Sequence, residues 1–176
     1  MTNEPKTIHA FSGTQGTGKT TAVFVLAAHL KRAHPGKEIG IVREVAKHCP
    51  YPVLSKEHNR VNEISQRWIF AAQMATELET AARYDIVVCD RTVIDCIAYT
   101  MAGGFHTLAA AMMAMARMHM STYDHIYVMR PIDKMETPAD DGFRNLNNDI
   151  RNKMDMYLIE IYKQMHIKIK YGCKWS

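Results

Sequence analysis

A run near the N-terminus, Gly13–Thr20, matches the pattern GxxxxGK[ST] in full, and this pattern is compatible with few folds. It follows a short β-prone segment, Thr7–Ser12, and it precedes apolar residues at helical spacing in Lys19–Ala33. Glycines allow backbone conformations closed to other residues, so successive amides can point into one concavity at the start of a helix. Strand, glycine-containing loop and helix together predict a phosphate-binding loop in an α/β domain.

The same run predicts the groups that would bind ATP and its metal ion. Lys19 provides a mobile positive charge for the β- and γ-phosphates, and the Thr20 hydroxyl is placed where Mg²⁺ would lie. The predicted cofactors are therefore ATP and Mg²⁺. The residues expected to bind ATP are Gly13, Thr14, Gln15, Gly16, Thr17, Gly18, Lys19, Thr20 and Thr21.

The rest of the chain alternates apolar runs with amphipathic periods. Three- and four-residue spacing predicts a long helix whose apolar stripe is Val61, Ile64, Trp68, Ala71, Ala75, Leu78 and Ala82. Further helices are predicted over Thr107–Met120 and over 150–165, and further strands at Ile39–Val42, Ile86–Cys89, Ile126–Met129 and Ile167–Tyr171. Five strands alternating with helices imply a doubly wound parallel sheet in the α/β class.

Composition supports one domain, residues 1–176, in a reducing compartment. The chain is 47% hydrophobic, enough to bury a core without disulfides, and its cysteines Cys49, Cys89, Cys96 and Cys173 form no CxxC pair. The polar N-terminus predicts neither a secretory signal nor a membrane span, so a cytoplasmic location is expected. The net charge of +4 suits phosphate-bearing ligands but does not decide for or against DNA.

An acidic residue that could bind the metal ion follows the strand Ile86–Cys89. Asp90 comes directly after this strand, and in a phosphate-loop fold this position lies beside the Mg²⁺. Arg91 and Thr92 come next in the sequence. Thr20 and Asp90 are therefore the predicted metal ligands.

These motifs, with Arg43-Glu44-Val45-Ala46 and Asp141-Gly142-Phe143-Arg144, resemble P-loop kinases grouped with deoxynucleoside kinases, thymidylate kinase and the ribosylnicotinamide kinase domain. The resemblance covers nearly the whole chain. It implies a P-loop NTPase fold, a five-stranded parallel sheet in the order 2-3-1-4-5, and transfer of the γ-phosphate of ATP to a hydroxyl of a nucleoside- or nucleotide-type acceptor.

The resemblance also implies roles for individual residues. Glu44 matches the acid that holds or deprotonates the accepting hydroxyl, and Arg91 matches the arginine near substrate or transferring phosphate. The segment of about 131–148 matches the lid, in which Arg144 is the first candidate for closing over ATP, whereas Arg130 and Arg151 could equally form surface salt bridges. The predicted catalytic residues are Lys19, Glu44, Asp90, Arg91 and Arg144.

The acceptor-reading residues are the least specific part of the sequence. In deoxynucleoside kinases a glutamine on the helix before the third strand reads the base, so Gln73 joins Glu44 and Arg91 as a predicted substrate ligand. Trp68 and Tyr99 could also line that pocket, although Trp68 lies on the apolar stripe and suits the core better.

Several alternatives stay open at this point. One is a kinase that acts on 5-hydroxymethyluracil in bacteriophage DNA, and others are an ATPase or a nucleotide-binding module without an acceptor. A GTPase is disfavoured, since Asn152-Lys153-Met154-Asp155 matches NKxD but lies inside a predicted helix. The partner is a nucleoside-type small molecule or a modified base in DNA, and the protein could be a monomer or a homodimer.

Overall fold

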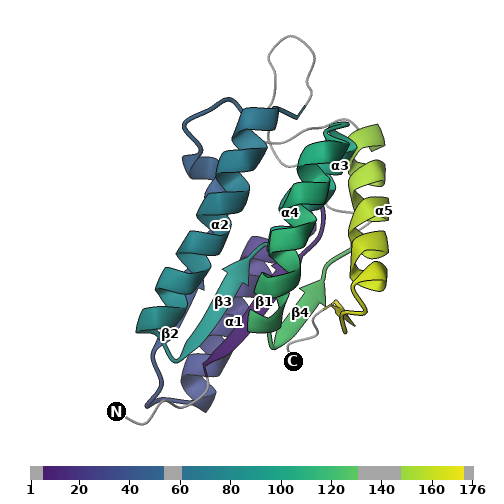
Figure 1. The fold of residues 1–176 in the computed structure, drawn as a ribbon. Coiled ribbons are helices and arrows are strands. Elements are labelled where there is room, and N and C mark those ends of the chain that lie inside the picture. The colour runs from purple at the N-terminus through teal and green to yellow at the C-terminus, as the bar shows by residue number, and fades with distance from the viewer. Residues whose placement is uncertain (1–5, 54–60, 131–147, 173–176) are drawn as a thin grey trace.

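The computed structural model describes residues 6–53, 61–130 and 148–172 of the chain (Figure 1). Arg144 and Cys173 lie outside these ranges. The strands are β1 (Thr7–Ser12), β2 (Ile39–Val42), β3 (Ile86–Asp90), β4 (His125–Val128) and β5 (Lys170–Tyr171). The helices are α1 (Lys19–Ala33), α2 (Glu63–Arg83), α3 (Val93–Ala102), α4 (His106–His119) and α5 (Asn148–Gln164), with short 3₁₀ turns η1 (Val45–His48) and η2 (Met120–Thr122).

The five strands form one parallel sheet in the order β2-β3-β1-β4-β5, which confirms the predicted fold class and strand order. Parallel pairing aligns the carboxyl ends of β1, β2 and β3 along one edge. The phosphate loop, Glu44 and Asp90 all follow or end these three strands, so the topology gathers them at one site.

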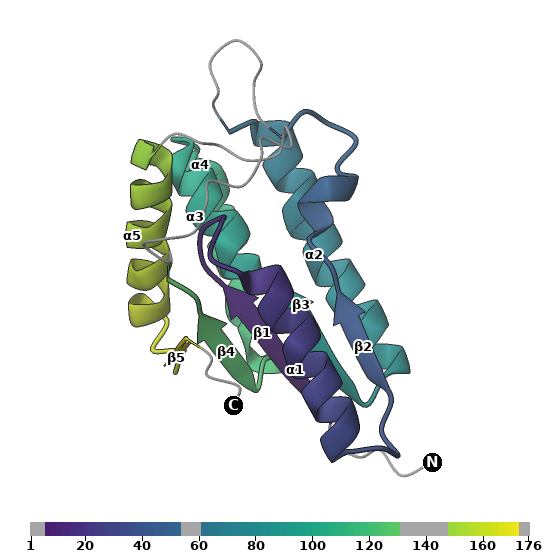
Figure 2. The ribbon, with the colours of Figure 1, turned by 180° about the vertical axis from the view of Figure 1, so that it is seen from behind.

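The sheet separates two apolar clusters of unequal size. The first includes α1 side chains such as Val23 and Leu26 packed on Phe11 and Val88. The other, larger cluster combines side chains from α2, α3, α4 and α5. Figure 2 shows α1 in front of the sheet, and Figure 1 shows α2, α4 and α5 in front of the opposite face. The result is a three-layer arrangement with α1 on one face of the sheet and α2, α3, α4 and α5 on the other.

The helix α3 was not predicted from the sequence. It packs against α2, α4 and α5, and its side chains Val93, Ile94, Asp95, Cys96, Ile97, Ala98 and Thr100 are all buried. Its buried residues include the polar Asp95 and Thr100, so the buried face does not stand out in the sequence as an apolar stripe. A capping box between Thr92 and Asp95 begins it, and this signal is visible in the sequence.

The predicted apolar stripe of α2 is wrong for most of its length. Ile64 and Leu78 are 55% and 54% exposed. The buried face carries Ile69 and Phe70 together with four polar residues, Ser65, Gln66, Gln73 and Glu77. Trp68 is partly buried against the core, in agreement with the sequence-based interpretation. The side chains of Ser65, Gln73 and Glu77 hydrogen bond within the protein, and a hydrophobic pattern cannot reveal such a face.

The last strand is shorter than predicted. β5 contains only Lys170 and Tyr171, both exposed, instead of the whole run from Ile167. No helix in the described ranges is long and apolar enough to span a membrane.

Candidate active site

The phosphate loop has the backbone that its sequence pattern predicts. Gly13, Gly16 and Gly18 have φ angles of 138°, 72° and 78°, in the region that favours glycine. Gly13 also lies close to β4, since a Cβ atom built there would be 2.4 Å from the carbonyl oxygen of Met129. Gly13 therefore combines a positive φ with close backbone packing. Thr21, the last of the predicted ATP ligands, is exposed on the first turn of α1.

Lys19 is folded into the loop. Its ammonium donates hydrogen bonds to the carbonyl oxygen of Thr14 and to Oγ1 of Thr17, the latter at 3.2 Å, and the residue is only 5% exposed. Burial, reinforced by the positive charge of Arg91, lowers the pKa of Lys19 to about 8. A phosphate anion in the loop would favour the protonated form, so the site has a cation ready for an anionic ligand.

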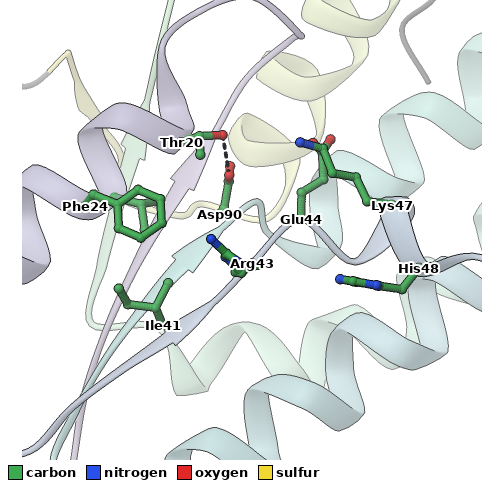
Figure 3. Close-up of a pocket in the computed structure, with 9 residues that line it drawn as sticks. Thr20, Phe24, Ile41, Arg43, Glu44, Lys47, His48 and Asp90 are labelled. Carbon is green, nitrogen blue, oxygen red and sulfur yellow. Dashed lines mark hydrogen bonds and ion pairs between the residues drawn. The ribbon is translucent and has the colours of Figure 1, made fainter. Parts of the chain in front are cut away.

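Thr20 and Asp90, the two predicted metal ligands, are in direct contact. The Thr20 hydroxyl donates to Oδ2 of Asp90 at 2.6 Å, across the gap between α1 and the end of β3 (Figure 3). A hydroxyl and a carboxylate are hard oxygen donors of the kind Mg²⁺ takes, with its remaining positions left to phosphate oxygens and water. These two residues therefore fit the ion that the sequence predicts.

Glu44 and Arg91 form a charged pair beside this contact. Arg91 Nε donates to Oε1 of Glu44 at 2.8 Å, Nη2 lies 2.7 Å from the same oxygen, and Nη1 reaches the carbonyl oxygen of Gly13 at 3.4 Å. The guanidinium lowers the pKa of Glu44 below its ordinary value, and this carboxylate in turn keeps Arg91 charged despite burial. Arg91, in the loop after β3, thereby contacts both the loop after β2 and the loop after β1.

Two further predicted residues, Tyr99 and Gln73, lie around Arg91. Its guanidinium carbon is 5.4 Å from the centre of the Tyr99 ring, so Tyr99 forms part of this site. Gln73 is 1% exposed, and its amide donates to Glu77 at 2.7 Å and to the backbone oxygen of Arg91 at 3.4 Å. A base-reading role for Gln73 stays a prediction, and its present contacts point to support of Arg91.

Asp95 is a site residue that the sequence analysis missed. This fully buried carboxylate accepts hydrogen bonds from the Ser12 hydroxyl at 2.8 Å and from the Gly13 amide at 3.0 Å. It also accepts from the amide and hydroxyl of Thr92, and the Tyr162 hydroxyl joins both Ser12 and Thr92 at 2.9 Å. The first turn of α3 therefore anchors the start of the phosphate loop.

Residues of the last helix, α5, also lie near the phosphate loop. Asn152–Asp155 lies within α5, as predicted, and not after a strand. Burial raises the pKa of Asp155, against the opposing influence of nearby Thr14, Arg151 and Lys19. Arg130, two residues after β4, places its guanidinium 4.7 Å from the centre of the Tyr171 ring. The predicted lid arginine, Arg144, lies outside the described residues and stays a prediction.

A pocket of about 260 Å³ opens beside the Thr20–Asp90 contact. Figure 3 shows Phe24 and Ile41 on one side of it and Lys47 and His48 on the other, with Arg43 between them. The Arg43 guanidinium lies 5.7 Å from the centre of the Phe24 ring. The full lining is Thr20, Val23, Phe24, Ile41, Arg43, Glu44, Lys47, His48 and Asp90. The pocket therefore combines an apolar wall with a basic rim.

Comparison with known proteins agrees with this architecture. The sequence profile of the AAA domain family matches residues 8–171, and the chain belongs to this family. No curated protein gives a significant sequence match. The structural matches confirm the P-loop fold and the expected resemblance to nucleoside and nucleotide kinases.

Three solved structures share the fold at low sequence identity. Thymidylate kinase from Ehrlichia chaffeensis superposes with a TM-score of 0.63 at 17% identity, over 98% of this chain and 89% of that one. Deoxyadenosine kinase from M. mycoides, solved with bound dATP, gives 0.65 at 14% identity, over 95% and 90%. The NadR protein in complex with NR gives 0.69 at 18% identity, and this chain spans about half of it (98% and 48%).

Proposed function

We propose that the protein is a kinase that uses ATP and Mg²⁺ to phosphorylate a hydroxyl of a nucleoside- or nucleotide-type acceptor. The observation that carries this proposal is the meeting of Thr20 and Asp90 at 2.6 Å beside the phosphate loop, with the Glu44–Arg91 pair next to it. A loop and metal ligands alone would suit any nucleotide hydrolase. The additional carboxylate–guanidinium pair, which borders the Gly13 carbonyl, suits an acceptor hydroxyl and a transferring phosphoryl group.

Each of these residues has a distinct role in the proposed reaction. The loop amides and Lys19 bind and orient the phosphates. Thr20 and Asp90 would hold Mg²⁺, which would supply positive charge at the phosphate oxygens. Glu44 stays ionised because Arg91 lowers its pKa, so it is a hydrogen-bond acceptor that orients the attacking hydroxyl more than a strong base. This is sufficient for a loose phosphoryl-transfer transition state, which depends mainly on positioning and electrostatics.

The pocket supports an acceptor with both an apolar ring and negative charge. Phe24 and Ile41 offer an apolar wall, while Arg43, Lys47 and His48 form the basic rim. A free nucleotide fits these properties. So does 5-hydroxymethyluracil carried in DNA, provided that the base leaves the stack to reach the phosphoryl donor. The names of two structural relatives, thymidylate kinase and deoxyadenosine kinase, favour a free nucleoside or nucleotide as the acceptor. A free nucleoside or nucleotide is therefore the first candidate.

The experiment that tests the proposal is a panel of acceptors incubated with γ-labelled ATP. The panel contains free nucleosides, nucleoside monophosphates, ribosylnicotinamide and duplex DNA with 5-hydroxymethyluracil. We expect one class to be labelled efficiently. Labelling of DNA should fall steeply as salt rises, since protein contacts to its backbone release counterions, whereas labelling of a free nucleoside should change little.

The outcomes separate the alternatives. Label in a free compound, with weak salt dependence, would exclude DNA as the acceptor. Label in DNA alone would exclude a free nucleoside or nucleotide as the acceptor. Release of labelled phosphate to water with every acceptor unlabelled contradicts the kinase proposal and favours an ATPase.

A further inference from the structure

A buried polar cluster lies behind the loop that joins β3 to α3. Its centre is Glu77 on α2, which is 1% exposed. The carboxylate of Glu77 accepts three hydrogen bonds: from Gln73 Nε2 at 2.7 Å, from His119 Nε2 at 2.6 Å and from the Tyr123 hydroxyl at 2.7 Å. These partners come from α2, from the end of α4 and from the segment before β4. Such a complete set of partners satisfies a carboxylate that burial alone would destabilise.

Two members of the cluster reach out to the β3–α3 loop. Gln73 uses its amide group a second time, donating to the backbone oxygen of Arg91 at 3.4 Å. The Tyr123 hydroxyl accepts a hydrogen bond from the amide of Val93 at 3.2 Å. Burial and the neighbouring Glu77 raise the pKa of Tyr123 well above its ordinary value, so it stays protonated and can donate to Glu77 while it accepts from Val93.

The loop needs such support because its backbone is strained. Arg91 has a φ of 101°, a value that side-chain-bearing residues rarely adopt. Its amide donates to the carbonyl oxygen of Phe11 at 2.9 Å, and the following amide, of Thr92, donates to Asp95 at 2.9 Å. Strained residues persist only where their surroundings fix them, and they gather at functional sites. The fixed conformation is what directs the Arg91 side chain to Glu44.

We propose that Gln73, Glu77, His119 and Tyr123 act together as a support that positions Arg91 for phosphoryl transfer, with Glu77 as its centre. The four are positioning residues, since Gln73 and Tyr123 bond to the backbone of Arg91 and Val93 and none of the four lines the pocket. The catalytic consequence rests on the proposed kinase function. The fixing of the β3–α3 loop does not depend on that function, and it can be measured separately.

The test uses Gln73→Met in the full-length protein, with Thr80→Val as the matched control. Methionine keeps the volume of the buried side chain but removes both hydrogen bonds. Among the described residues, the Thr80 hydroxyl bonds to the Thr76 carbonyl within α2, so the control perturbs the same helix without reaching the loop. We expect Gln73→Met to lower kcat roughly tenfold, because small displacements of a positioned group slow reactions by such factors, with KM for ATP unchanged. The control should leave both constants unchanged.

A double-mutant cycle then separates positioning from general destabilisation. If Gln73 acts through Arg91, adding Gln73→Met to Arg91→Ala should lower kcat no further. An additional loss equal to that of the single variant would overturn the proposal. Glu77→Gln, a second variant of nearly the same shape, should repeat the pattern of Gln73→Met.

Amide hydrogen exchange provides a readout that needs no acceptor. In Gln73→Met the amides of Arg91, Thr92 and Val93 should exchange at least about tenfold faster, while amides in the middle of α1 stay unchanged. Unchanged exchange at these three amides would refute the support itself. Absence of phosphoryl transfer in the unmodified protein, with the exchange result as expected, would instead refute the proposed function and the catalytic role while leaving the support established.

Discussion

At the scale of single residues, Lys19 is the phosphate-loop side chain that we expect to act directly in phosphoryl transfer. Lys19→Ala should lower phosphoryl transfer by at least about 100-fold, because it removes a charge that stabilises the transition state. Far-ultraviolet circular dichroism should remain that of the unmodified protein. Lys31→Ala is the matched control on the same helix, since Lys31 is surface-exposed and pairs with Glu38. Near-normal turnover in Lys19→Ala would contradict the mechanism.

The lowered pKa of Lys19 gives a second residue-scale prediction. The free protein binds this proton below about pH 8, and bound phosphate raises the pKa, so ATP binding should take up a proton above pH 8. The affinity should be constant below that value and fall by about tenfold per pH unit above it, until the pKa of the complex is reached. Calorimetric titrations at pH 7, 8 and 9 test this, and Lys19→Met should show a flatter dependence.

At the scale of elements, the first turn of α3 has two structural roles. Asp95 caps this helix and also holds Ser12 and Gly13. Asp95→Ala should therefore lower the free energy of unfolding by about 3 kcal/mol or more, because several buried donors lose their acceptor, and it should also weaken ATP binding. Asn62→Ala removes the simple N-cap of α2 and should cost only about 1 kcal/mol. Urea denaturation measures both, and equal losses would show that Asp95 is only a cap.

The elements also show what a sequence can predict. The phosphate loop, Asp90 and the parallel sheet were predictable because each has a local signal: a glycine pattern, or an apolar strand followed by an acid. The strand order came from a resemblance, since pairing is not a local property. The helix α3 and the inner face of α2 were missed for a common reason. Asp95 and Glu77 are buried by partners distant in the chain, and hydrophobic periodicity treats buried polar residues as exposed ones.

At the scale of the whole molecule, a single domain stays a prediction, and the two cores on opposite faces of one sheet support it. Both cores should unfold together in urea, since β1 and β3 contribute to each. Trp68 fluorescence, recorded in a Trp175→Phe background, reports on the larger core, and exchange of α1 amides reports on the smaller one. Coincident transitions are expected. Two separate midpoints would contradict a single cooperative unit.

The central claim is that the γ-phosphate passes to a hydroxyl acceptor and not to water, and its most direct test is the fate of that phosphate in a single turnover. The protein is mixed with less than one equivalent of γ-labelled ATP, Mg²⁺ and the acceptor found in the panel. Most of the label should appear in the acceptor, and Glu44→Gln should slow this transfer while ATP affinity stays nearly unchanged. Label found almost entirely as inorganic phosphate, at the same rate with and without acceptor, would contradict the account.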